Sequence, residues 1–162
     1  MAVPPALPEA AAALADDPAA LARHLVEHYH APIRALFPEL LALAERVETH
    51  HGDLPECPLG LSLVVGDLFN EVIEQFDRTE QVILPLVVAG QRAAAREPAR
   101  ALADAQAGVT ARFAALGQLT GGFVPPAFAC RTWRGLYEGL DRLSRDWNDQ
   151  QRIGLALVSG IA

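Results

Sequence analysis

Apolar residues recur at intervals of three and four along most of this chain, and no segment alternates apolar and polar residues as a β-strand does. This spacing is the period of an amphipathic α-helix. It predicts four helices, over residues 17–51, 61–89, 98–119 and from about 127 to 158. The links between them are short, which favours an all-α protein built as an antiparallel up-down four-helix bundle.

The first and last predicted helices carry the clearest apolar stripes. Their periodic residues are Leu21, Leu25, Tyr29, Ile33, Leu36, Leu40, Leu43 and Val47 in the first, and Trp133, Leu136, Tyr137, Leu140, Leu143, Trp147, Ile153 and Leu157 in the last. Because proline removes a backbone hydrogen bond from a helix, Pro32 and Pro38 predict kinks in the first helix, and Pro85 predicts a bend late in the second. The Gly and Pro residues of segments 51–60 and 120–126 predict links.

Length and charge limit the fold and the partners. A chain of 162 residues is about the size of one domain, so residues 17–162 are expected to form the bundle and the Ala/Pro-rich residues 1–16 an N-terminal segment. The net charge of -7 opposes binding to phosphate backbones and anionic lipid, so neither nucleic acid nor membrane is an expected partner. The N-terminus lacks the basic region of a secretion signal, and we therefore expect a cytoplasmic protein.

All five histidines lie in the first third of the chain. A metal centre inside a helical bundle takes ligands from several facing helices, which this distribution does not offer. His24 and His28 are four residues apart and are interpreted as a solvated surface pair, whereas His30 is expected inside the core. His50 and His51 are explained by their place at a helix end, where a partly charged imidazole meets the negative end of the helix dipole.

The nucleophilic and acidic residues show no catalytic signature. Cys57 and Cys130 are too far apart for a metal or redox motif and are interpreted as reduced core or loop residues. The acidic residues of the second helix are interpreted as a solvated face paired with Arg78; they are Glu71, Glu74, Asp77 and Glu80. Since the sequence also lacks a serine-hydrolase elbow and a phosphate-binding glycine loop, the residues alone predict no active site.

Four segments resemble the hemerythrin-type domain of the iron-sulfur cluster repair di-iron proteins, the RIC family. In chain order they read LVEHYHAPIRALFPEL, ERVETHHGDLPECPLGL, RTEQVILP and LTGGFVPPAFACRTWRGLYEGL. The resemblance covers residues from about 20 to 158 and implies a hemerythrin-like four-helix bundle.

The resemblance also implies a set of iron ligands. These are one His on the first helix, His-x-x-x-Glu on the second, one His on the third and His-x-x-x-Glu on the fourth. His30 matches this pattern, but the other five positions carry Gln75, Thr79, Gln106, Gln150 and Gly154. Glutamine is a weak neutral ligand, and both negative charges that would balance two irons are replaced. We therefore expect no di-iron centre and no other resident cofactor.

The replacements predict a polar core. Glutamine is long and keeps both a donor and an acceptor, so we expect His30, Gln75, Gln106 and Gln150 to form a buried cluster in which each amide is satisfied by its neighbours or by trapped water. Thr79 and Gly154 are small, and the space beside them must be filled by water, a small ligand or repacked side chains.

Two functions remain open at this point. The first is a metal-free relative of the repair proteins that acts as a binding, regulatory or scaffold protein in nitrosative or oxidative stress rather than as an enzyme, together with a protein partner or a second copy of itself. The alternative is a redox or gas-binding protein that holds a single metal or a haem through His30.

Overall fold

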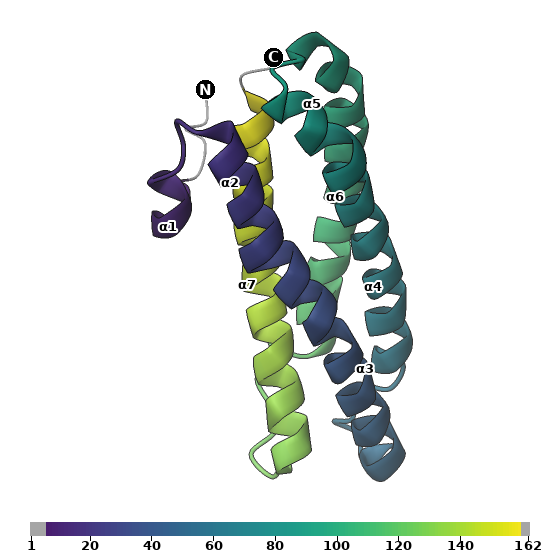
Figure 1. The fold of residues 1–162 in the computed structure, drawn as a ribbon. Helices are drawn as coiled ribbons and strands as arrows, with labels where there is room; N and C mark the ends of the chain where they lie inside the picture. The colour runs from purple at the N-terminus through teal and green to yellow at the C-terminus, as the bar shows by residue number, and fades with distance from the viewer. Residues whose placement is uncertain (1–5, 160–162) are drawn as a thin grey trace.

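A computed structural model describes residues 6–159, and every regular element in that range is helical (Figure 1). In chain order the elements are α1 (Glu9–Ala12), α2 (Pro18–Leu25), η1 (Val26–His30), α3 (Ala31–His51), α4 (Leu61–Arg78), η2 (Thr79–Ile83), α5 (Leu84–Val88), α6 (Arg92–Leu119) and α7 (Arg131–Ser159). Here η1 and η2 are short π-helical turns. The prediction of an all-α protein is confirmed. Within the same residues, no helix combines the length and the apolar character needed to cross a lipid bilayer.

All described helices except the short α1 join into four rods (Figure 1). The first rod is the continuous run of α2, η1 and α3, the second is the run of α4, η2 and α5, and α6 and α7 form one rod each. Helix α3 packs against α4 and α7, and α4 packs against α6. The first rod begins at the residue the sequence indicates, because the Asp17 side chain accepts a hydrogen bond from the Ala20 N–H (3.0 Å) and Pro18 occupies the first turn.

Two clusters of buried side chains fill the bundle. A stack of four rings crosses it: His30 lies on Phe76 with ring centroids 3.8 Å apart, Phe76 faces Trp147 at 6.3 Å, and Trp147 faces Phe113 at 5.4 Å. Each ring comes from a different rod, so the stack joins all four. Stacked and tilted aromatic pairs contribute about 0.5–1.5 kcal/mol each beyond the area they bury.

The first two rods are interrupted by π-helical turns rather than by sharp kinks at proline. Pro32 follows η1 by two residues and Pro85 follows η2 by two residues, whereas Pro38 lies inside α3. A proline ring clashes with the carbonyl four residues before it, here in η1 and η2, and the wider π turn moves that carbonyl away. A widened turn thus precedes Pro32 and Pro85, whereas the α-helix α3 continues through Pro38, where the sequence predicts a kink.

The boundaries of the last two rods differ from those expected. Helix α6 begins at Arg92, six residues before the predicted start at residue 98, and it contains Pro98. The residues before this proline include three consecutive alanines, the strongest helix formers, which extend the helix towards its N-terminus. Helix α7 begins at Arg131, a few residues later than expected, after a turn in which the Ala129 N–H donates to the Pro126 carbonyl (2.9 Å).

Two glycines one turn apart on α7 are expected to respond in opposite directions to alanine. A methyl group at Gly139 would overlap the buried Leu40 side chain of α3, whereas a methyl group at Gly135 would meet nothing within 4 Å. Overpacking opposes the gain in helix propensity, so we expect Gly139→Ala to lower the free energy of unfolding by about 1 kcal/mol and Gly135→Ala to raise it by about 0.5–1 kcal/mol. Urea denaturation of both variants measures the difference, and equal stabilisation by the two would contradict the close approach of α3 and α7.

Candidate functional site

The six positions that the resemblance assigns to iron ligands are distributed over all four rods. His30 ends η1, Gln75 lies on α4, Thr79 begins η2, Gln106 lies on α6, and Gln150 and Gly154 lie on α7. His30, Gln75, Thr79 and Gln150 are buried, whereas Gln106 and Gly154 are half-buried. The fold thus turns most of these positions towards the interior of the bundle.

Four of the six residues share one small pocket. Thr79, Gln106, Gln150 and Gly154 line a cavity of about 50 Å³, and the rest of its lining consists mainly of apolar side chains from α2, η2, α6 and α7. Because a single water needs about 10–15 Å³, this space accommodates a few waters or a molecule of similar size. The His30 and Gln75 side chains are not part of its lining.

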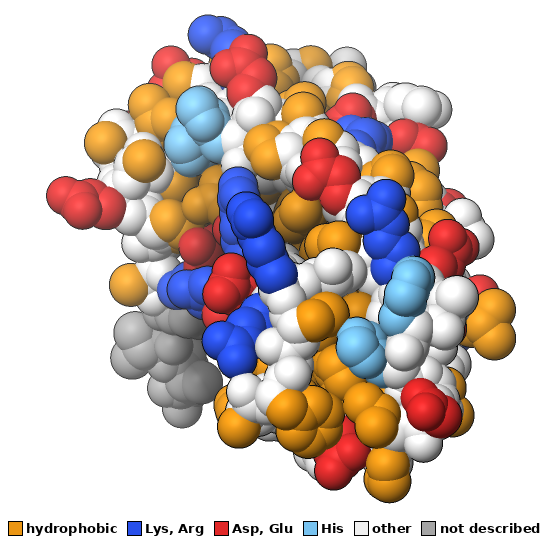
Figure 2. Space-filling view, turned by 90° about the horizontal axis from the view of Figure 1, so that it is seen from below, with side chains coloured by type: hydrophobic (Ala, Val, Ile, Leu, Met, Phe, Trp, Pro, Cys, Tyr) orange, Lys and Arg blue, Asp and Glu red, His pale blue; other side chains and the backbone are white. Residues whose placement is uncertain are grey.

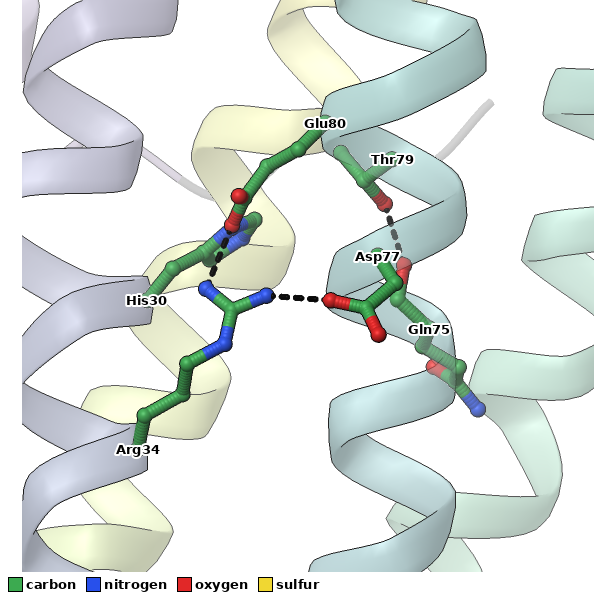
Figure 3. A network of polar contacts seen from close by, with 6 residues as sticks. All are labelled: His30, Arg34, Gln75, Asp77, Thr79 and Glu80. Atoms are coloured by element: carbon green, nitrogen blue, oxygen red, sulfur yellow. Dashed lines mark hydrogen bonds and ion pairs between the residues drawn. The ribbon is translucent and has the colours of Figure 1, made fainter.

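His30 belongs to a network of charged side chains that links the first two rods (Figure 3). Its Nδ1 lies 2.7 Å from Glu80 Oε1. The same oxygen accepts a hydrogen bond from Arg34 Nη1 (2.6 Å), and Arg34 Nη2 donates to Asp77 Oδ1 (2.8 Å). The Arg34 guanidinium also lies 5.4 Å from the centroid of the Phe76 ring. The network therefore connects η1 and α3 to α4 and η2.

The environment of His30 favours the neutral imidazole. Burial lowers its pKa and the charge of Arg34 adds to this effect, while the hydrogen bond and charge of Glu80, with a smaller contribution from the Gln150 amide, offset it only in part. Since a carboxylate oxygen can only accept, we assign the proton of the neutral ring to Nδ1, which donates to Glu80. The lone pair is then on Nε2, which is buried and has no hydrogen-bond partner among the described residues.

Two carboxylates, those of Glu80 and Asp77, pair with the single positive charge of Arg34. Burial alone would lower the pKa of Arg34, but the hydrogen bonds and charges of Glu80 and Asp77 outweigh burial and raise it. Arg34 is therefore a permanent positive charge beside the bundle centre.

Two of the buried amides also contain atoms without partners. Gln75 Oε1 and Gln150 Nε2 make no hydrogen bond with any residue that the structure describes. The Thr79 hydroxyl donates to the backbone carbonyl of Gln75 (2.8 Å) and so faces its own helix. In Figure 3 the Gln75 amide lies apart from the His30 ring. Together with His30 Nε2, the unpartnered atoms are one donor, Gln150 Nε2, and two acceptors, Gln75 Oε1 and His30 Nε2. Buried water can satisfy such a set.

The residues present do not fit a di-iron centre. The six positions supply one imidazole, three neutral amides, one hydroxyl and one glycine, with no carboxylate to balance the cations. The nearby carboxylates of Glu80 and Asp77 already bind Arg34. Between residues 6 and 159, no group of three or more His, Cys, Asp or Glu side chains is arranged to hold a metal ion.

The acidic residues of the second rod differ in part from the interpretation drawn from the sequence. Glu74 does pair with Arg78 (3.0 Å), and Glu71 pairs with Arg112 of α6 (2.8 Å). Asp77 and Glu80, however, bind Arg34 across the bundle. Glu80 lies in the π turn η2, which adds a residue to the helical turn, and a uniform period of 3.6 misses the resulting change in the direction of its side chain.

Among the remaining histidines and cysteines, His24 lies beside His28 and His51 lies beside Cys130. The rings of His24 and His28 are 4.5 Å apart; His24 is half-buried and His28 exposed. Burial and the charge of His28 lower the pKa of His24. Cys57 is buried, and Cys130 is half-buried with its Sγ 3.3 Å from His51 Nε2. This contact joins residues 79 positions apart, and no local sequence pattern indicates it.

Comparison with known proteins identifies homologues of this chain. No family model matches the chain. The iron-sulfur cluster repair protein YtfE of Yersinia pseudotuberculosis (serotype O:1b) is 33% identical over 122 residues, which cover 75% of this chain and 55% of the relative. The protein of the same name from Yersinia pestis (strain Pestoides F) is 32% identical over the same shares. These homologues support a relation to the iron-sulfur cluster repair family. The chain spans about half the length of these relatives.

Removal of the Glu80 carboxylate is expected to destabilise the protein. Glu80→Ala leaves the buried Nδ1–H of His30 without its acceptor and takes one partner from Arg34, so we expect the free energy of unfolding to fall by about 1–3 kcal/mol. Glu74→Ala is the matched control, because it breaks the exposed pair with Arg78 on the same rod and is expected to change stability by less than about 0.5 kcal/mol. Equal losses in chemical denaturation would contradict a structural role for the network.

The lowered pKa of His30 predicts a dependence of stability on pH. As the pH falls below about 6.5, the unfolded chain binds a proton at this residue before the folded protein does. Folding stability should therefore decrease from about pH 6.5 down to the folded-state pKa, with a slope of up to about 1.4 kcal/mol per pH unit. His30→Gln should lack this component, as measured by urea denaturation at several pH values. Parallel pH profiles for the two proteins would exclude a buried neutral His30.

Proposed function

We propose that this chain is a hemerythrin-like protein that keeps the scaffold of the iron-sulfur cluster repair proteins without their di-iron centre. In this proposal it acts as a binding, regulatory or scaffold protein in nitrosative or oxidative stress and is not an enzyme. The observation that carries the proposal is the donor set of the bundle centre, where a single imidazole stands among amide, hydroxyl and glycine positions.

The arrangement of the rods supports the hemerythrin-like part of the proposal. In Figure 1 successive rods run in alternating directions, and the contacts of α3 with α4, α4 with α6, α6 with α7 and α7 with α3 close a ring. An antiparallel up-down bundle has this connectivity. The four segments that resemble the RIC family fall within these rods or their links.

The charges around the centre support the absence of a pair of irons. Two ferrous or ferric ions in a low-dielectric interior require anionic ligands, because the desolvation of a buried cation is costly unless it is paired. Here the neutral His30 is the only strong ligand among the six positions, and the positive charge of Arg34 stands beside it. The hydrogen bonds of Glu80 to His30 and Arg34 hold these side chains in place, and no metal is needed for that purpose.

The size of the cavity narrows the class of ligand. Its volume of about 50 Å³ is far below the roughly 300–1,000 Å³ of pockets that enclose a drug-sized molecule or a cofactor. Water or a diatomic molecule fits this space, whereas a haem requires the rods to separate. We therefore propose that binding to macromolecules takes place on the outer surface of the bundle.

One observation favours the second candidate, a protein that holds a single metal or a small gas through His30. Metal-binding histidines commonly donate the other ring N–H to a carboxylate, which orients the ring and increases its basicity. His30 donates in this way to Glu80, and its free Nε2 is buried. The donor set that would complete the coordination of a metal is missing among the described residues, and we therefore rank this function second.

Metal analysis separates the two candidates. We expect the full chain, purified without chelator, to contain far less than one iron. A variant that combines Gln75→His, Thr79→Glu, Gln106→His, Gln150→His and Gly154→Glu serves as a positive control and is expected to bind about two irons per chain, because it restores the ligand set of a di-iron bundle.

The outcomes for the unmodified chain are distinct. About two irons per chain, with oxo-bridged absorption, would reject the proposal. One metal per chain that is absent from His30→Ala would support the second candidate. Loss of the metal from His30→Ala is interpreted only if circular dichroism shows that this variant keeps its helical content.

A further inference from the structure

Cys130 and His51 meet at the end of the bundle where α3 ends and α7 begins. His51 Nε2 lies 3.3 Å from Cys130 Sγ, and both side chains are half-buried. The His51 ring also packs beside Trp133, with centroids 5.3 Å apart. Figure 2, which views the molecule from this end, shows histidine side chains beside arginine and hydrophobic side chains on the surface. A thiol in contact with an imidazole is the arrangement from which a reactive thiolate forms.

The pair opens into a surface pocket. The pocket has a volume of about 510 Å³ and is lined by Arg46, Val47, His50, His51, Cys130 and Thr132. Its titratable and charged lining groups are one arginine, two histidines and the thiol itself, with no carboxylate among them. Arg46 is the permanent charge of this lining, and it favours a small molecule that carries negative charge.

The start of α7 adds a second source of positive potential. Cys130 directly precedes α7, and its carbonyl accepts a hydrogen bond from the Arg134 N–H (3.0 Å). Cys130 therefore occupies the N-cap position of a 29-residue helix. The N-terminal end of a helix carries partial positive charge and stabilises a thiolate next to it.

The other cysteine lies in a contrasting environment. Cys57 is 7% exposed, and its Sγ lies 3.9 Å from the Val47 carbonyl oxygen. Burial, together with the charges of Glu48 and Asp53, raises the pKa of the Cys57 thiol. A buried thiol of this kind is unreactive, so the chain contains its own internal control.

We propose that Cys130 is a redox-modification site that takes an anionic disulfide of low molecular weight, such as glutathione disulfide, with His51 as the base. His51 Nε2 accepts the proton of the Cys130 thiol, and the thiolate attacks one sulfur of the disulfide. A bond forms between Cys130 Sγ and that sulfur while the disulfide bond breaks. The departing thiolate takes the proton from His51 and leaves as a thiol.

This exchange balances without another reagent. One protein thiol and one disulfide become one mixed disulfide and one free thiol, so the Cys130 sulfur is oxidised and the released sulfur is reduced. Arg46 lines the pocket and is the group that would bind a carboxylate of the incoming molecule, whereas the His50 Nδ1–H donates to the Arg46 backbone carbonyl (2.9 Å) on its own helix. The exchange takes place at the end of the bundle and involves no metal in the bundle centre.

The test is the rate of mixed-disulfide formation in the full chain at neutral pH. We expect glutathione disulfide to modify Cys130 at least about tenfold faster than Cys57, as measured by mass spectrometry of the peptides, and the two rates to become similar in the urea-unfolded chain. His51→Gln should slow the reaction of Cys130 about tenfold or more, because no base then accepts the proton. His50→Gln, the same replacement one residue earlier, should slow it by less than about threefold.

A neutral reagent separates the base from the charge of the pocket. The reaction of Cys130 with iodoacetamide should be slower in His51→Gln but not in Arg46→Ala. Its reaction with glutathione disulfide should be slower in both variants. Equal reaction rates for Cys130 and Cys57 in the folded protein would overturn the proposal. This comparison uses the unmodified chain, so it decides the matter even if no His51 variant folds. Equal losses in His50→Gln and His51→Gln would overturn the assignment of His51 as the base.

Discussion

The carboxylate of Glu80 is the contact on which the centre of this bundle depends. One of its oxygens binds both His30 and Arg34 and so joins η1 and α3 to η2. His30 ends the π turn η1 and Glu80 lies in the π turn η2, and each of these turns is followed by a proline two residues later. The contact between the first two rods therefore involves backbone that departs from the regular α-helix in both of them.

This arrangement changes the electrostatics of a site that resembles a di-iron centre. The resemblance implies four imidazoles and two carboxylates, whereas the six matching positions keep one imidazole. The carboxylates that are present nearby bind an arginine instead. Arg34 thus offsets part of the negative charge that could attract cations, and the six matching positions themselves contribute only neutral polar atoms.

The sequence predicts the fold well and the site only in part. Helical periodicity gives the four rods, and burial of His30, Gln75 and Gln150 agrees with their expected places in the core. Glu80 lies within the π turn η2, where a uniform helical period does not apply, and the pairing of Asp77 with Arg34 depends on the packing of α3 against α4. The half-exposure of Gln106 depends on how closely α6 approaches α7, and the meeting of His51 with Cys130 depends on the packing of two helix ends. Such contacts arise from tertiary structure and leave no local pattern.

The ring stack and the His51 contact together place one tryptophan at each of two chemically different regions. Trp147 lies in the stack that ends on His30, and Trp133 lies beside His51. These are the only two tryptophans in the chain. Intrinsic fluorescence from single-tryptophan versions of the protein would therefore report separately on the interior of the bundle and on the surface pocket beside Cys130, without any attached dye.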